Sequence, residues 1–203
     1  MSLNRLKYKK GDTLIEVLFA VAIFSLVAVG SISIMNQGTA TAQRALEITL
    51  VRQEIDAQAE TLRFLNSSYI ANSSSAEQWQ DIHDYAIDGS SGGDVSDFGS
   101  GASCVIPTKA FILNAHTAKF VDPTGTNKPV LAETFSQVRY SLSNPNIFSK
   151  AEGIWIEAVK VEPADPNQNN AGYIDFHIRA CWDSPGQPIP VTIGTIVRLY
   201  EPI

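Results

Sequence analysis

The chain has 203 residues, and its 21 Asp and Glu outnumber its 15 Lys and Arg, which gives a formal net charge of −6 at neutral pH. This acidic balance argues against nonspecific nucleic-acid binding by the bulk surface, because affinity for phosphates comes mainly from Lys and Arg, although it leaves a local basic patch open. Walker A, Gly-x-Ser-x-Gly and paired-cysteine metal motifs are absent from the sequence, which therefore predicts neither an enzyme nor a cofactor.

The first element in chain order is an uncharged stretch of 19 residues from Val17 to Met35. At about 1.5 Å per residue, a helix of this length crosses a hydrocarbon core of roughly 30 Å. Four cations precede it with no acid among them, namely Arg5, Lys7, Lys9 and Lys10. We therefore expect a single-pass membrane protein, with its amino end in the cytoplasm and the rest of the chain outside.

One carboxylate, Glu16, lies at the cytoplasmic edge of this stretch. An ionised carboxylate costs about 2.5 to 3.5 kcal/mol at a bilayer centre, so a charge placed here usually has a partner. The joint spacing of Gly11, Glu16 and the apolar run resembles the class III signal of type IV prepilins and pseudopilins. The resemblance covers roughly residues 5–38.

The resemblance implies a processing step and an assembly step. A prepilin peptidase would remove a leader, residues 1–11, by cutting between Gly11 and Asp12, and the new terminus would be methylated. Glu16 would then be the fifth mature residue, whose carboxylate neutralises the terminal amine of a neighbouring subunit. The family usually has phenylalanine where this chain has Asp12, so N-methylation stays open, and a second carboxylate lies beside the amine.

The implied partners are prepilin peptidase, other pilin subunits, a membrane platform protein and an assembly ATPase. Before assembly the chain would lie in the membrane, and afterwards in an extracellular surface filament. Loss of the leader would leave 11 cations against 21 acids, a net charge of −10.

Two simpler interpretations compete for the same residues. A secretory signal could end at Ala40-Thr41-Ala42, but the apolar regions of such signals run only 7 to 15 residues. A plain membrane anchor would leave both Glu16 and the junction at Gly11 without a purpose.

Beyond the membrane the helix is expected to continue, so that one helix runs from about Thr13 to about Leu65. Residues 12–38 would form its membrane and polymerisation half, and residues 39–65 its extracellular half. Gly30 and Gly38 each weaken a helix by up to about 1 kcal/mol relative to Ala, which favours a bend there. An apolar stripe recurs at helical steps and consists of Ile48, Val51, Ile55, Ala59, Leu62 and Leu65. We expect it to pack on a sheet, since the spacing lasts under three heptads and disfavours a coiled coil.

Residues 66–103 are rich in Ser, Gly, Asn and Asp and are predicted to form a loop-rich connector. Within it, the near-helical spacing of Trp79, Ile82 and Tyr85 predicts a short helix over residues 76–87. The acids of this region do not fit the EF-hand ligand pattern, so a solvated acidic loop is the preferred interpretation.

The remainder, residues 104–203, is predicted to be an antiparallel β-sheet head, which makes the fold class α+β. Strands are expected at residues 110–113, 135–142, 154–161, 173–182 and 191–200. Turn-rich spacers separate the last three, which suggests an antiparallel meander. In the strand from Tyr173, alternation places Ile174, Phe176, Ile178 and Ala180 towards the helix, with Asp175, His177, Arg179 and Cys181 on the other face.

The two cysteines, Cys104 and Cys181, both lie in the predicted exterior part, where an oxidising compartment would let them pair. Two unrelated buried thiols are the alternative. If Cys181 faces away from the helix, its partner must come from a loop that covers the sheet.

No catalytic constellation emerges from the scattered His83, His116 and His177, and Trp155 and Trp182 fit sheet packing better than an adhesive surface. Three functions stay open. The preferred one is a type IV pilin-like structural subunit, with Asp12 and the extended head favouring a minor pilin. The others are a pseudopilin of a type II secretion or DNA-uptake machine, and a membrane-anchored adhesion domain that never polymerises.

Overall fold

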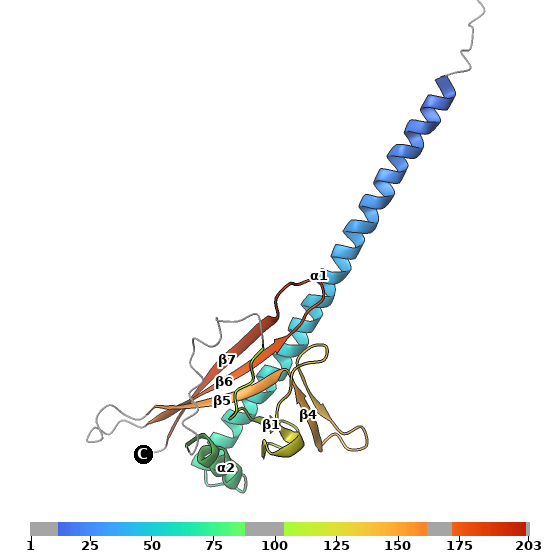
Figure 1. The fold of residues 1–203 in the computed structure, drawn as a ribbon. Coiled ribbons are helices and arrows are strands. Elements are labelled where there is room, and N and C mark those ends of the chain that lie inside the picture. The colour runs from blue at the N-terminus through green and yellow to red at the C-terminus, as the bar shows by residue number, and fades with distance from the viewer. Residues whose placement is uncertain (1–11, 88–103, 162–171, 202–203) are drawn as a thin grey trace, which may run out of the picture. The chain divides into compact units, whose positions relative to one another are not determined.

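The computed structural model of the chain describes residues 12–87, 104–161 and 172–201. The predicted leader, with Gly11 and the four cations, lies outside these residues. The chain divides into two compact units, Met1–Gln43 and Arg44–Ile203, to both of which the first helix contributes. Along the chain the elements are α1 (Asp12–Ile70), α2 (Ala76–Ile87), β1 (Ile112–Asn114), β2 (Lys119–Val121), the short 3-10 helix η2 (Gly125–Asn127), β3 (Gln137–Tyr140), β4 (Phe148–Glu152), β5 (Ile154–Val161), β6 (Tyr173–Trp182) and β7 (Val191–Tyr200) (Figure 1).

The long predicted helix is confirmed, and it ends five residues later than expected, at Ile70. It continues without a break through Gly30 and Gly38, so the expected weakening at these glycines does not interrupt it. The predicted short helix is confirmed at Ala76–Ile87. The loop between the two helices is therefore short, and Asn72 within it has a positive φ of 49°, a conformation that asparagine tolerates better than most residues.

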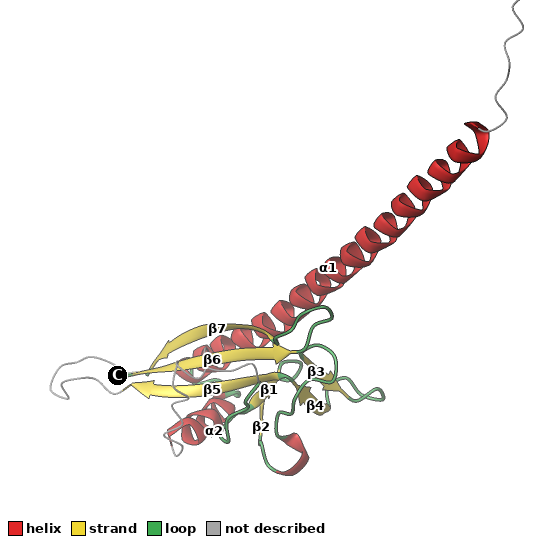
Figure 2. Ribbon diagram, turned by 45° about the horizontal axis from the view of Figure 1, so that its top comes forward, coloured by secondary structure: helices red, strands yellow, loops and turns green. Residues whose placement is uncertain are grey.

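The head contains a three-stranded antiparallel sheet in the order β5-β6-β7 (Figure 2). Its strands occupy the predicted residues, and the predicted meander is confirmed by the pairing of Trp155 with Arg179 and of Cys181 with Thr192. Two smaller antiparallel pairs, β1-β2 and β3-β4, complete the sheets of the described residues.

The smaller strands were predicted less well. The strand expected at residues 110–113 is observed two residues later as β1, and that expected at 135–142 is shorter, as β3. The sequence did not predict β2 or β4. Their sequences, Lys-Phe-Val and Phe-Ser-Lys-Ala-Glu, are too short or too polar to show the alternation that marks a half-buried strand.

The predicted stripe lies on the part of α1 within the second unit and belongs to the same buried core cluster as one face of β6. Val51, Leu62 and Leu65 are completely buried, and Ile48 is partly buried at its edge. Each such aliphatic side chain contributes about 1.5 to 3 kcal/mol through burial. The four β6 residues predicted to face the helix are also completely buried, namely Ile174, Phe176, Ile178 and Ala180.

The opposite face of β6 carries the alternating polar residues and is also buried. His177, Arg179 and Cys181 are all buried on it, as are Trp155 and Glu157 of the neighbouring β5. A small apolar cluster lies over this face. It consists of Ala110, Trp155 and Cys181, with the partly buried Cys104 and Ile106 packed against them. The sheet is therefore covered on both faces at this end.

Candidate functional site

The part of α1 within the first unit presents an apolar surface to its surroundings. Its large hydrophobic side chains, from Leu14 to Met35, are 57–77% exposed. The most apolar window of the helix has a mean hydropathy of 2.6 and none of it is buried, so α1 is long and apolar enough to cross a membrane. Exposed apolar surface of this extent calls for lipid or another protein as its neighbour.

Two hydroxyl groups within this apolar segment are satisfied by the helix itself. Ser25 Oγ donates to the carbonyl of Val21 at 2.7 Å, and Ser31 Oγ donates to that of Val27 at 2.8 Å. A polar group without a partner costs several kcal/mol in hydrocarbon, so these internal bonds make both serines compatible with lipid.

Glu16 lies one turn into α1 and is exposed. Within the described residues its carboxylate makes neither a hydrogen bond nor an ion pair. A negative charge near a helix N-terminus interacts favourably with the helix dipole. The carboxylate is thus available to a group outside the described part of the chain.

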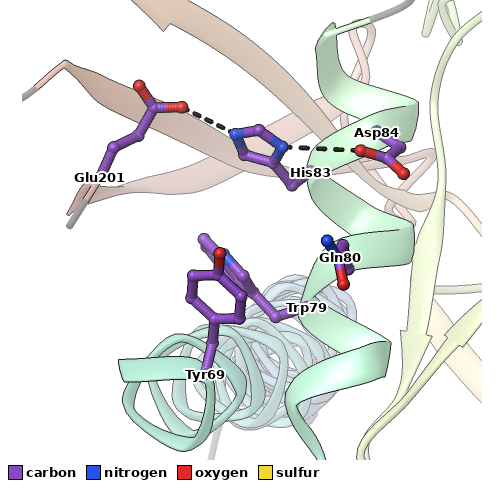
Figure 3. A pocket seen from close by; sticks show the side chains of 6 residues that line it. All are labelled: Tyr69, Trp79, Gln80, His83, Asp84 and Glu201. Atoms are coloured by element: carbon purple, nitrogen blue, oxygen red, sulfur yellow. Dashed lines mark hydrogen bonds and ion pairs between the residues drawn. The ribbon is translucent and has the colours of Figure 1, made fainter. Parts of the chain in front are cut away.

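In the second unit, a separate cavity of about 320 Å³ is lined by Tyr69, Trp79, Gln80, His83, Asp84 and Glu201 (Figure 3). Tyr69 comes from the last turn of α1, and Glu201 directly follows β7. The other four come from α2, where the four-residue steps from Trp79 to His83 and from Gln80 to Asp84 bring the members of each pair close together. We refer to this cavity as the α2 pocket.

An ion-pair network connects the walls of the α2 pocket. His83 Nε2 donates to Glu201 Oε1 at 2.7 Å, and Lys160 Nζ lies 3.3 Å from the same oxygen. His83 Nδ1 lies 3.7 Å from Asp84 Oδ1. Burial alone would raise the pKa of Glu201, but the hydrogen bond from His83 and the charge of Lys160 lower it below its usual range. Glu201 is therefore held as a carboxylate.

The indole of Trp79 is unusual among the three tryptophans. Trp155 Nε1 donates to Glu157 at 2.7 Å, and Trp182 Nε1 donates to Glu47 at 3.0 Å. Trp79 is only 3% exposed and packs edge-on against Phe176, but its Nε1 has no hydrogen-bond acceptor among the described residues. Trp79 is one of the residues that line the α2 pocket.

The comparisons with known proteins bear on the amino-terminal segment. Residues 6–32 match a family model described as the prokaryotic N-terminal methylation motif. The chain carries the class III signal of type IV pilins and pseudopilins. No curated protein and no solved structure gives a significant match. The prepilin-type resemblance is thereby confirmed for the signal, and the head is described by its own structure alone.

The structure joins Cys104 and Cys181 in a disulfide, with 5.7 Å between their Cα atoms. As the sequence required, the segment that supplies Cys104 covers the face of the sheet opposite the helix. Gly153 approaches this region closely, since a Cβ on it would lie 2.5 Å from the carbonyl oxygen of Cys181. Its φ of +64° also favours glycine. Both the lack of space for a Cβ and the backbone conformation therefore restrict position 153 to glycine.

Near the disulfide lies a buried polar cluster. Arg179 Nε is 3.5 Å from Glu157 Oε1, and Arg179 Nη2 is 3.4 Å from His177 Nδ1. Burial lowers the pKa of His177, as does the neighbouring charge of Arg179. His177 is therefore held mainly neutral in a hydrogen-bonded setting, which agrees with the structural role that the sequence favours for it.

His116 stacks on Tyr140 with their ring centroids 4.1 Å apart.

Sequence reasoning missed the α2 pocket. The spacing of Trp79, His83 and Asp84 on a predicted helix was available as a signal, but it also fits simple packing. Nothing in the sequence pairs His83 with Glu201, which is 118 residues away. The acids of α2 do not form a metal site, because no group of three or more suitable ligands occurs among the described residues.

Proposed function

We propose that this protein is a type IV pilin-like structural subunit, processed by prepilin peptidase and assembled through α1 into a surface filament. The observation that carries the proposal is the exposed apolar part of α1, most of which lies within the class III signal matched at residues 6–32. The same helix segment would serve first as a membrane anchor and then as the contact between subunits.

Energetic reasoning favours reburial of this segment. Removing a long apolar helix from lipid into water would expose its entire surface, which is strongly unfavourable. Extraction is feasible only when the segment is transferred to neighbouring apolar helices, which offer an environment similar to lipid. An exterior filament built on a shared bundle of α1 helices meets this requirement.

Glu16 would provide the register of that bundle. A carboxylate inside an apolar bundle is stable when a positive group pairs with it, and peptidase cleavage before Asp12 would create such a group in each subunit. The absence of a partner for Glu16 among the described residues supports an intermolecular pair. The platform protein, the assembly ATPase and other pilins belong to this proposal as partners.

A pseudopilin is the second candidate, because the same signal serves both classes. The two differ in how far the filament grows, and Asp12 in place of the usual phenylalanine favours a subunit of low abundance. We favour a minor pilin for this reason.

The deciding experiment is amino-terminal mass mapping of the protein from host membranes and from sheared surface filaments. We expect the terminus at Asp12 in both fractions. The terminus at Asp12 in membranes alone would favour a pseudopilin or a rare minor subunit, whereas an intact leader would reject processing and leave a plain anchored domain. The same spectra report whether the new amino group is methylated.

A further inference from the structure

We infer that the α2 pocket binds one neutral sugar residue. This inference concerns the head alone and does not rest on the proposed assembly function, since an unprocessed chain would have the same pocket. Three properties of the pocket support a sugar as its ligand: its unpaired donors, its fixed acceptors and its size.

The hydrogen-bond donors of the pocket are more informative than its acceptors. A buried tryptophan usually finds an acceptor for its N–H, as Trp155 and Trp182 do in this chain. Trp79 Nε1 has none among the described residues, although its ring is almost wholly enclosed. The hydroxyl of Tyr69 and the amide of Gln80 likewise make no hydrogen bond within the described part of the chain. Three residues with unpaired donor groups thus line one cavity.

The acceptors are carboxylates held in fixed positions. Glu201 is tied to His83 and Lys160, which leaves its second oxygen for a ligand. Asp84 is largely exposed at the mouth, where its carboxylate can accept a further bond. Hydroxyl groups both donate and accept, so a sugar matches such a mixed set, and hydrogen bonds to carboxylates are among the stronger ones. The two acids disfavour an anionic sugar.

The size of the cavity, about 320 Å³, is at the lower end of the range for small-ligand sites. It suits one ring rather than a chain of rings. The pocket is also preformed, because the His83–Glu201 bond ties α2 to the residue after β7 and Trp79 is anchored on Phe176. A preformed site loses less conformational entropy when a ligand binds.

The test uses the full-length chain, labelled with ¹⁵N, in micelles of a detergent without a sugar headgroup. The probes are D-galactose, D-mannose and N-acetyl-D-glucosamine at millimolar concentrations, with D-glucuronate as the anionic comparison. The readout is the three tryptophan indole N–H signals, of which that of Trp79 is assigned by its loss in Trp79→Phe. We expect at least one neutral probe to shift the Trp79 signal in a saturable manner and to leave those of Trp155 and Trp182 in place.

Variants connect the signal to the pocket. Asp84→Asn should weaken binding about tenfold, the effect expected when a hydrogen bond to a charged group is weakened. Asp81→Asn is the matched control, since Asp81 is an exposed acid of the same helix outside this pocket, and it should bind as the unmodified chain does. Because Asp84 is exposed, its variant tests the inference even if Trp79→Phe folds poorly.

Three outcomes would overturn the inference. The first is no saturable shift with any neutral probe. The second is equal or stronger binding of D-glucuronate, which would contradict the charge argument. The third is a saturable shift that Asp84→Asn leaves unchanged, which would place the bound sugar elsewhere.

Discussion

Glu47 of α1 accepts two hydrogen bonds from the end of the central strand and the loop that follows it. Trp182 Nε1 donates to Glu47 Oε2 at 3.0 Å, and Ser184 Oγ donates to the same oxygen at 2.7 Å. Trp182 is 1% exposed and Ser184 is 5% exposed, so both donors depend on this carboxylate. The bonds connect Glu47 of α1 to Trp182 at the end of β6 and to Ser184 in the β6–β7 connection. Glu47 and Trp182 are 135 residues apart along the chain.

Glu47→Ala should therefore destabilise the head by about 2 to 4 kcal/mol, because it leaves two buried donors without their acceptor. The measurement is urea unfolding of the full-length chain in micelles, followed by near-ultraviolet circular dichroism. Asp56→Ala, on an exposed position of the same helix, is the control and should change the free energy of unfolding little. Equal effects of the two substitutions would contradict the role given to Glu47.

Gln58 supplies a second prediction. It is completely buried, and its amide group both donates to the carbonyl of Leu113 and accepts from its N–H, each at 2.9 Å. Gln58→Leu should cost about 2 to 5 kcal/mol despite adding apolar area, because both backbone groups of Leu113 lose a partner. The exposed Gln53→Leu is the matched control. A stable Gln58→Leu variant would show that β1 can satisfy these groups differently.

The pH dependence of stability should reveal Glu54. Burial raises the pKa of this carboxyl, and the nearby His116 offsets the shift only in part. Because its folded pKa is above the ordinary 4.5, the stability linked to Glu54 is fully present below that pH and is lost as pH rises through the folded value. Glu54→Gln should therefore unfold like the unmodified chain in acid and be more stable at neutral pH.

The measurement is the difference in free energy of unfolding between this variant and the unmodified chain, followed across acidic to neutral pH. Asp56→Asn removes an exposed charge from the same helix and serves as the control. A difference for Glu54→Gln that grows towards acid would have the wrong sign and would reject the explanation by burial.

Periodicity explains which parts of this fold could be predicted from the sequence. The stripe from Val51 to Leu65 and the alternation of Ile174 and Phe176 reflect burial of one face, and burial leaves a regular pattern. Gln58 is a polar residue that interrupts the apolar stripe. The structure explains it, because its side chain bonds to the backbone of Leu113 in β1. A polar pair between residues far apart in the chain leaves no periodic pattern in the sequence, so it could not be predicted.

The same limit applies to the outer face of β6. Its alternating polar residues gave no sign of burial, but His177 and Arg179 are buried, and the segment with Cys104 packs over the same face. The sequence indicated that cover only through the position of Cys181. The partnership of His83 with Glu201 could not be predicted, since it depends on where α2 packs.

The disulfide should contribute substantially to the stability of the head. Cys104 and Cys181 are separated by 77 residues, and closing a loop of that length in the unfolded chain stabilises by about 4 to 5 kcal/mol in the loop-entropy estimate. Reduction should lower the free energy of unfolding by an amount of this order. Mass analysis of freshly isolated protein, with and without reductant, should first show no free thiol, and two free thiols would contradict the pair.

Glu16 gives the most direct test of assembly. Glu16→Ala should insert into the membrane normally, because it makes the segment more apolar, but it should be absent from sheared filaments, because a neighbour's terminal amine would lose its partner. Ser25→Ala is the control within the same segment, since Ser25 bonds only to its own helix among the described residues. The measurement is the ratio of filament-bound to membrane-bound protein for each variant. Normal incorporation of Glu16→Ala would count against the ion pair, whereas equal loss with Ser25→Ala would indicate that helix packing alone decides incorporation.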